Sequence, residues 1–459
     1  MWLRPRRNIN YHLPWVLALT TVSLCSPAWS HETNRGFEFG SYGRVVAGNQ
    51  SEGNPTEDVQ VVSHGPRLLE PSYAELDFSY TQAQSDEAAL FRTQLTLGLG
   101  EELFHFSGDF DSDIAIRNLY LEAGRLGLDG LSVWVGSRMY RGDDIYLLDF
   151  WPLDEQNTVG GGFALKLGST DLRLHIGLNR LNDEYQVQEI EVTGDDLSTR
   201  NVLFLSRQRR VVTLRAEHHS TPSEGLGLKL IAYGEGHHLP EGVYREADLD
   251  ELVLPADSGW LMGLEIGLYA PESGSFANLF ARYGMSLGAY DELAIPHGLN
   301  MEKTTSGATE LLVGFSGNLE LGSLGLMSGA YIRNFEDADP NIYDLDDRWE
   351  MSAVVRPAWY LTDSVHLIGE VSVQYLHPNG LSPETREHET PMVTQLALMP
   401  SISLGRGSYS RPQLRVVYAM TQLNTSAQLT YAKEDPRRAL ATQHYIGIGA
   451  EWWFNSTRY

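Results

Sequence analysis

The chain has 459 residues, of which 42% are hydrophobic and 20% are charged, and its formal net charge is −26 at pH 7. Such an excess of acidic residues disfavours nucleic acid and other anionic partners. The single cysteine excludes an intramolecular disulfide, so stability has to come from burial and hydrogen bonding. Mean hydropathy is −0.26, and no stretch beyond residue 30 approaches the ~20 apolar residues of a membrane-spanning helix.

The first thirty residues fall into three regions of different composition. Arg4, Arg6 and Arg7 precede the short apolar run LPWVLALTTVSLC, and small residues follow in SPAWS. This order is typical of a secretory signal peptide, and the apolar run is too short to cross a bilayer as a helix. We therefore expect residues 1–30 to be a signal peptide cleaved after Ser30, and residues 31–459 to form one exported domain.

Short segments of alternating apolar and polar residues recur along the rest of the chain, separated by glycine, aspartate, asparagine or proline. Such segments predict β-strands. In chain order the predicted strands are residues 37–47, 73–80, 89–99, 131–140, 163–168, 171–178, 211–219, 226–233, 260–270, 277–288, 310–321, 324–334, 351–361, 365–376, 393–404, 413–423, 427–432 and 444–454. The pattern predicts an all-β chain of about eighteen antiparallel strands.

The two faces of these segments differ in a consistent way. In residues 73–80, Tyr73, Glu75 and Asp77 share one face, and the apolar residues share the other. Residues 365–376 and 444–454 follow the same rule, with aromatic residues near the strand ends. An apolar outer face, a polar inner face and terminal aromatics are typical of an outer-membrane β-barrel. A soluble β-sandwich, whose strands also alternate, is the alternative.

A transmembrane barrel has consequences for its links and its outer face. Lipid offers no partner for unpaired backbone groups, so the sheet has to close, and about eighteen strands enclose a water-filled interior. We expect membrane lipid around Tyr80, Trp452 and Phe454, and tight links to form periplasmic turns. The long acidic links are expected to be extracellular loops, at residues 48–72, 180–200, 234–257, 289–309 and 377–391.

Several blocks of the sequence resemble one known family. They are EFGSYGR near the N-terminus, YAEL in the next strand, NLYLEAGRLGLDGLSVWVGSRMYRGDDIYLLDFW, LRAEHH, VVRPAWYLTDSVHLIGEV, SRPQLRVVYA and the closing GAEWWF. The chain resembles the maltoporin-type, carbohydrate-selective outer-membrane porins. The resemblance implies a homotrimer of eighteen-stranded barrels, each with an inward-folded third loop, that pass sugars by facilitated diffusion with accompanying ion conductance.

The resemblance also implies which residues line the pore. An aromatic track would include Tyr42, Tyr73 and Trp453, with Trp151 at the constriction. Flat aromatic rings suit the apolar faces of sugars, and charged groups beside them replace lost water contacts of the hydroxyls. The charged positions carried over from the family are Arg44, Arg67, Glu75, Arg117, Arg138, Asp144 and Asp149.

The sequence departs from the family at the expected constriction. Gly142 stands where the family has an arginine two residues before Asp144, although Arg141 is adjacent. Met351 occupies the position of an inward tryptophan, with Trp349 on the same face. The third loop, expected at residues 151–162, is short. Neither the sugar nor its chain length therefore follows from the resemblance.

Two further segments differ from the family pattern. The second loop has no tryptophan that could enter a neighbouring pore, and its aromatic residues are Phe104, Phe106 and Phe110. The chain also continues beyond Phe454 through residues 455–459, for which the sequence suggests no role.

Two alternatives remain open besides a sugar channel. The inward charges could instead serve a general diffusion porin without sugar specificity. A barrel enzyme or receptor is the other alternative, but the sequence has no GxSxG, HExxH or P-loop motif. Adjacent histidines such as His218 and His219 point to opposite faces of a strand and make poor metal ligands. No cofactor or metal is expected.

Overall fold

The computed structural model describes residues 35–50, 59–85, 88–100, 103–104, 113–128, 130–193, 198–245, 251–291, 294–341 and 343–456. The expected signal peptide lies outside these ranges. No helix in the described ranges is long and apolar enough to span a membrane.

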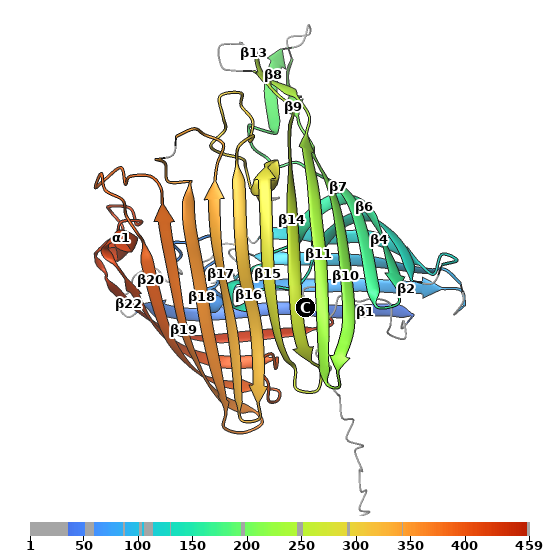
Figure 1. The fold of residues 1–459 in the computed structure, drawn as a ribbon, viewed down its shortest axis with the longest axis vertical. Coiled ribbons are helices and arrows are strands. Elements are labelled where there is room, and N and C mark those ends of the chain that lie inside the picture. Colours follow the sequence, from blue (N-terminus) through green and yellow to red (C-terminus); the bar gives the residue numbers. More distant parts are fainter. Residues whose placement is uncertain are drawn as a thin grey trace, which may run out of the picture.

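Eighteen of the described strands form one sheet (Figure 1). They are β1 (Gly36–Gln50), β2 (Tyr73–Ala83), β3 (Leu90–Gly100), β4 (Asp113–Gly124), β5 (Leu131–Arg141), β6 (Glu155–Leu167), β7 (Thr170–Asn179), β10 (Arg209–Ser223), β11 (Leu226–Leu239), β14 (Asp257–Ala270), β15 (Ser275–Ser286), β16 (Thr309–Leu321), β17 (Leu324–Glu336), β18 (Arg348–Tyr360), β19 (Val365–Pro378), β20 (Met392–Ser403), β21 (Gln413–Leu423) and β22 (Thr442–Phe454).

The sheet closes into a barrel because β1 pairs with both β2 and β22. Each strand is antiparallel to its neighbours, and Tyr42 lies opposite Glu75 on one side and Trp453 on the other. Closure leaves no sheet edge with unpaired N–H and C=O groups, as lipid requires. The predicted eighteen-stranded transmembrane β-barrel is confirmed.

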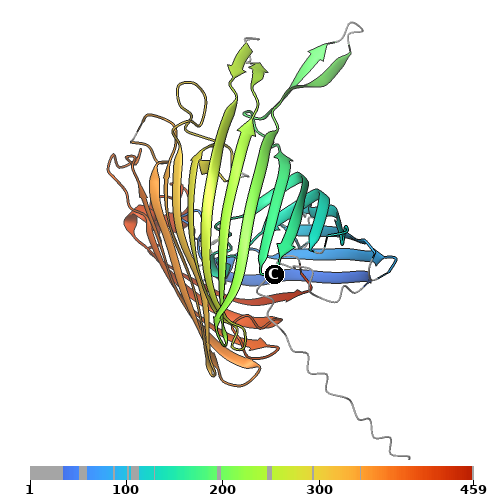
Figure 2. The ribbon, with the colours of Figure 1, turned by 45° about the vertical axis from the view of Figure 1, so that its right-hand side comes forward.

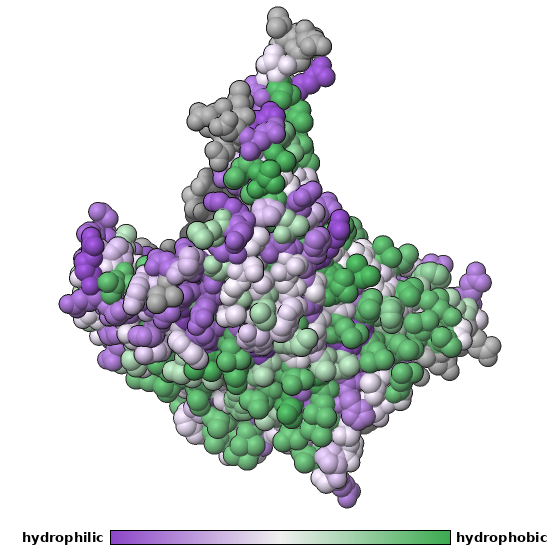
Figure 3. All heavy atoms as spheres, turned by 45° about the horizontal axis from the view of Figure 1, so that its top comes forward, coloured by the Kyte–Doolittle hydropathy of each residue, from purple (hydrophilic) through white to green (hydrophobic). Residues whose placement is uncertain are grey.

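The two faces of the barrel differ as the alternation predicts. Glu75 and Asp77 on β2 are buried inside, whereas Tyr80 is 52% exposed on the outside. On β22, Ile446 and Ile448 are more than 60% exposed. Figure 3 shows hydrophobic residues over the flanks of the strands and hydrophilic residues around the loops. The outer face is therefore an apolar surface suited to lipid.

Two hairpins extend beyond the barrel at its loop end (Figures 1 and 2). One pairs β8 (Val187–Thr193) with β9 (Thr199–Ser206), and the other pairs β12 (Gly242–Arg245) with β13 (Glu251–Leu254). The helical turns in the described ranges are η1 (Arg67–Leu69), η3 (Tyr146–Leu148), η4 (Leu287–Ala289), α1 (Thr425–Gln428) and η5 (Pro436–Ala439).

The predicted barrel strands need two corrections, and the four strands of the two hairpins were not predicted. The pattern misses β4, and it wrongly predicts a strand at residues 427–432. Asn424 accepts a hydrogen bond from the backbone N–H of Ala427 and so caps α1, which covers the start of this segment; turns follow it. The two errors cancel in the predicted strand count.

Candidate functional site

The third loop, residues 142–154, folds into the barrel. An isolated bridge joins Ile145 to Phe150, and η3 lies between them. The apolar residues of the loop pack against the inner face of β11 and β14–β18, at Ile231, Tyr233, Leu261, Phe280, Leu312, Met327, Tyr331 and Val354. The predicted inward fold is present, but its predicted bounds of 151–162 are wrong because residues 155–162 belong to β6.

Both ends of this loop are held by cations of the barrel wall. Arg215 on β10 forms an ion pair with Asp154, whose Oδ1 also accepts from the N–H of Gly142 at 2.7 Å. Lys229 on β11 pairs with Asp143. A side chain at position 142 would collide with the Arg215 guanidinium and the Asp154 carboxylate. Arg215 of the barrel wall already fills the space that a side chain at position 142 would need. The arginine that the resemblance implies at this position therefore has no room, and Gly142 fits.

The tip of the loop is fixed to the barrel wall through Glu451 of β22. The Tyr146 hydroxyl donates to Glu451 Oε2 at 2.8 Å, and Arg411 Nε donates to the same oxygen at 3.0 Å. Tyr42 contributes a third hydrogen bond, at 3.3 Å to Oε1, and Arg67 lies 3.5 Å from that oxygen. All five groups are buried. Two arginines and two hydroxyls thus offset the desolvation of one carboxylate.

The first link, predicted as an extracellular loop at residues 48–72, also enters the barrel. Its first residues extend β1, and the described part at 59–72 lies inside. The Ser63 hydroxyl donates to Glu350 at 3.0 Å and accepts from Arg333 at 3.2 Å. The His64 ring stacks on Phe150 with centroids 3.8 Å apart. Apolar residues of this link pack with those of the wall and α1, namely Val59, Val61, Val62, Val393, Leu423 and Ala427. The extracellular prediction is therefore wrong for residues 59–72.

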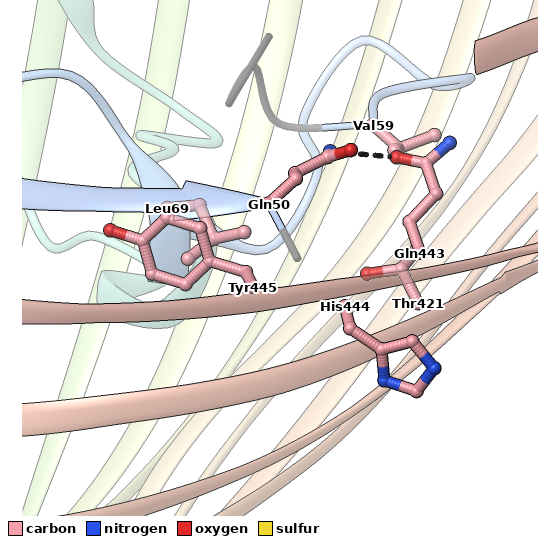
Figure 4. Close-up of a pocket in the computed structure, with 7 residues that line it drawn as sticks. All are labelled: Gln50, Val59, Leu69, Thr421, Gln443, His444 and Tyr445. Atoms are coloured by element: carbon pink, nitrogen blue, oxygen red, sulfur yellow. Dashed lines mark hydrogen bonds between the residues drawn. The ribbon is translucent and has the colours of Figure 1, made fainter. Parts of the chain in front are cut away.

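A small cavity marks where this first loop meets the wall (Figure 4). Its volume is about 10 Å³, which leaves room for one water molecule at most. Gln50 at the end of β1 donates to Gln443 on β22 at 3.0 Å, and Val59 and Leu69 line the same space. The first loop is therefore sealed against the wall here, and no sugar fits behind it.

The docking of the first loop should depend on pH through His64. Burial lowers the pKa of His64 from 6.5 to about 4. The docked loop thus keeps a neutral imidazole, whereas a released loop would bind a proton, so docking loses stability as the pH falls from about 6.5 to about 4. We expect faster hydrogen exchange in peptides covering residues 61–69 at pH 5 than at pH 7, after correction for intrinsic rates. His64→Phe retains a ring against Phe150 and should abolish this pH dependence; an unchanged dependence would reject the assignment.

Three of the predicted charged residues, Arg44, Arg67 and Asp149, meet between the first and third loops. Arg44 Nη1 lies 2.7 Å from Glu70 and 3.8 Å from Asp149 in the third loop. Arg67 lies 3.3 Å from the same Glu70 and 3.7 Å from Asp149. Glu70 was not predicted, because nothing in the alternation distinguishes it within a loop. The cluster joins β1, the first loop and the third loop.

A second group of predicted residues lies on β2 and β4. The Tyr73 hydroxyl donates to Glu75 at 2.6 Å, and Arg117 lies 3.2 Å from the same carboxylate. Arg117 reaches this position because the β3–β4 register shifts between Thr96 and Leu97, so that it has no partner residue in the ladder. Such a bulge re-aims a side chain, here toward the lumen.

Arg138 belongs to a separate cluster on the inner face of β4 and β5. Its guanidinium lies 4.6 Å from the ring centre of Tyr120 and 5.1 Å from that of Tyr140, and 3.5 Å from Glu122. The Arg138 guanidinium also lies 5.5 Å from the ring centre of Trp134, which is 2% exposed. These rings are covered by one another, so this cluster stabilises the wall and presents little surface to a solute.

Two predicted aromatic residues are covered rather than open to the lumen. Tyr42 is 0% exposed, and Trp151 is 3% exposed with the Arg141 guanidinium 3.8 Å from its ring centre. Arg141 also pairs with Glu155 at 2.7 Å. Asp144 lies half-buried in the same loop. These two rings therefore pack within the interior, and neither presents a face to a solute.

Other aromatic rings inside the barrel are partly open. Trp453 packs 6.1 Å from Tyr146 and 6.4 Å from Tyr409, measured between ring centroids, and Phe276 lies 6.0 Å from Tyr409. Tyr73 is also half-buried. Tyr146 and Tyr409 were not predicted, because both lie in links where alternation carries no information. The resemblance blocks, which include Tyr146 and Arg411, were the available signal.

The prediction that Trp349 and Met351 line the lumen is wrong. Trp349 is 44% exposed on the outer face of β18 and Met351 shares that face, whereas Glu350 between them is 1% exposed and bonds to the first loop. The resemblance implies the inner face for these two residues, and the burial pattern of β18 has the opposite parity. Phe104 is 40% exposed. Phe106, Phe110 and residues 457–459 lie outside the described ranges.

A larger cavity of about 170 Å³ lies between the two inward loops and the wall. Phe150 and Trp151 line one part of it, and Glu155, Arg282 and Asp291 line another. Arg282 also donates to the Pro152 carbonyl at 3.1 Å and lies 3.2 Å from Asp291. The volume is below the ~300–1,000 Å³ of pockets for drug-sized ligands. The cavity is therefore narrow. Both aromatic rings and charged groups line it.

Comparison with known proteins places this barrel in a family. A model of the LamB porin family matches residues 37–454. The chain belongs to the LamB porin family. The maltoporin of Vibrio cholerae serotype O1 is 22% identical to this LamB porin over 438 residues, covering 91% of the chain and 94% of the relative.

Solved outer-membrane proteins are similar to this LamB porin at low identity. The trimer form of OmpT from Vibrio cholerae is 12% identical, covering 92% of this chain and all of that one, with a TM-score of 0.40. OccAB1 from Acinetobacter baumannii is 8% identical, with coverage of 91% and 96% and a TM-score of 0.46. Family membership and the closed barrel together support a bacterial outer-membrane location and a channel rather than an enzyme.

Proposed function

We propose that this LamB porin passes sugars, of the maltose and maltodextrin class or other oligosaccharides, by facilitated diffusion. The observation that carries the proposal is the row of half-buried rings inside the barrel, in which Tyr409 lies 6.4 Å from Trp453 and 6.0 Å from Phe276. Aromatic faces match the C–H surfaces of a sugar ring, and charged groups match its hydroxyls.

A channel needs binding that is weak and distributed over several positions. The half-buried ring of Tyr73 supplies a further stacking position inside the barrel. Arg44 and Glu75 lie on the same inner face and supply donors and acceptors beside them. The lumen thus offers several shallow contacts instead of one deep pocket.

A general diffusion porin without sugar specificity is the second candidate. The burial of Tyr42 and Trp151 favours it, because covered rings cannot stack on a solute. In this case the buried charges would set only the ion selectivity of the pore.

The purified full-length chain in planar lipid bilayers separates the candidates. We expect an ion conductance that falls in a saturable way when maltose or longer maltodextrins are added. Conductance without sugar block would favour the general porin. Absence of conductance would reject both channel candidates and favour a receptor.

We propose three further features on the basis of the family resemblance. The chain would assemble as a homotrimer, residues 1–30 would act as a signal peptide cleaved near Ser30, and residues 31–459 would form the mature protein. N-terminal sequencing and native mass spectrometry of the membrane-extracted protein test these features.

A further inference from the structure

Three carboxylates converge in the link between β17 and β18, outside the barrel strands. Asp337, Asp344 and Asp347 each place one carboxylate oxygen within 4.8 Å of the other two. Asp337 and Asp347 are 7% and 5% exposed. Three like charges in a buried setting repel one another and therefore need compensation.

Backbone amides satisfy one oxygen of each carboxylate. Asp337 Oδ1 accepts from the N–H of Asp339 at 2.7 Å, and Asp344 Oδ1 accepts from those of Asp346 and Asp347 at 3.2 and 3.0 Å. Asp347 Oδ1 accepts from the N–H of Asp337 at 2.7 Å. These bonds orient the three side chains and leave the second oxygen of each available.

The second oxygen of Asp337 is buried and has no hydrogen-bond donor. Gly298 lies against it in a left-handed conformation, and a side chain at that position would collide with this oxygen. Among the described residues, no lysine or arginine forms an ion pair with the three carboxylates. The contact of His297 at 3.9 Å is with Asp346, which is not one of the three. A buried carboxylate oxygen without a donor or cation is costly, so the site lacks a positive partner.

The electrostatics of the link agree with this geometry. Burial, followed by the charges of Asp344 and Asp347, raises the pKa of Asp337 to about 7. Burial likewise raises the pKa of Asp347. A bound cation would reverse both effects, because it stabilises the ionised carboxylates.

We propose that Asp337, Asp344 and Asp347 bind a calcium ion. Calcium prefers carboxylate and carbonyl oxygens at about 2.3–2.6 Å, so oxygens on opposite sides of the ion are up to about 5 Å apart. The observed separations of up to 4.8 Å fit that sphere. The smaller magnesium ion requires closer, near-octahedral ligands and usually retains several waters.

The ion would join three links of the barrel. The N–H of Ala338 donates to the Gly298 carbonyl at 2.9 Å, which connects the β17–β18 link to the β15–β16 link. The N–H of Asn379 donates to the Asp347 carbonyl at 2.8 Å, which connects it to the β19–β20 link. Calcium should therefore protect all three links against local opening, and not only its ligands.

Hydrogen exchange of the full-length protein, stripped with a chelator, tests the proposal. We expect about 5 mM CaCl2, which saturates even weak extracellular-type sites, to slow exchange in peptides covering residues 294–308, 337–347 and 377–382. The same concentration of MgCl2 should have a clearly smaller effect. Equal exchange with calcium and with chelator would overturn the proposal, and a larger effect of magnesium would overturn the choice of calcium.

Substitutions identify the ligands. Asp337→Asn and Asp347→Asn should raise the calcium midpoint of this protection at least about tenfold, since each removes a charged ligand. Asp346→Asn is the matched control, because it changes the same charge in the same link outside the cluster, and it should leave the midpoint within about twofold. An equal shift in all three variants would indicate a diffuse charge effect and reject the site. If the two ligand variants do not fold, the wild-type and Asp346→Asn titrations still decide between calcium protection and none.

Discussion

Replacing Trp453 and Tyr409 by alanine is expected to weaken sugar block of the ion current by about tenfold to a hundredfold. Both rings lie on the inside of the barrel and are half-buried, with centroids 6.4 Å apart. Each aromatic contact contributes on the order of 1 kcal/mol beyond area burial, and 1.4 kcal/mol is a tenfold change in affinity. The single-channel conductance without sugar should change much less, because the charged groups remain.

Trp452→Ala is the matched control for this experiment. Trp452 is the neighbour of Trp453 on β22 but points to the outer face, where its ring covers Gly43 and its Nε1 donates to Ser41 at 3.2 Å. Removing it deletes the same side chain without touching the lumen. Equal sugar block in wild type and the inner double variant, or an equal loss in the Trp452 variant, would sink the aromatic-track assignment.

Glu451→Gln is expected to release the tip of the third loop and enlarge the channel. The carboxylate accepts from Tyr146 and Arg411, so the amide would leave the buried Arg411 guanidinium without its counter-charge and weaken the contact with Arg67. Breaking a buried ion pair costs about 3 kcal/mol or more. Conductance and current noise should rise together, while thermal unfolding should shift to lower temperature.

Glu370→Gln separates loop release from loss of stability. Glu370 is 2% exposed and pairs with Arg356 on the neighbouring strand, and neither residue belongs to the third-loop contacts described above. This variant should also unfold at a lower temperature but retain wild-type conductance. If Glu451→Gln conducts like wild type, or if both variants widen the channel, Glu451 does not hold the loop.

The barrel itself was predictable because one physical requirement acts on every strand. Residues 73–80 and 444–454 alternate throughout, since one face meets lipid and the other meets water and loops. The pattern failed where local chemistry interrupts it. In β4 the extra residue Arg117 shifts the alternation by one position, and the cap Asn424 turns an alternating segment into a short helix.

From alternation alone, the candidate site was predictable only where it lies on strands. Parity assigns Tyr73, Glu75 and Trp453 to the inner face, and the structure has them there. Parity carries no information for links, so Tyr146, Tyr409 and Arg411 were missed. The resemblance misled on β18, where Trp349 lies outside.

Strand periodicity determines that this chain forms a closed barrel with an apolar outer face, because each strand turns one face to lipid and has to pair its backbone groups with a neighbour on both edges. Only the tertiary structure decides what fills the barrel. A polar loop is equally compatible with water outside or inside, so its position depends on partners far away in sequence. Tyr146 meets Glu451 across 305 residues, and Ser63 meets Glu350 across 287. Such pairs have no local signature, yet they join both inward loops to the barrel wall.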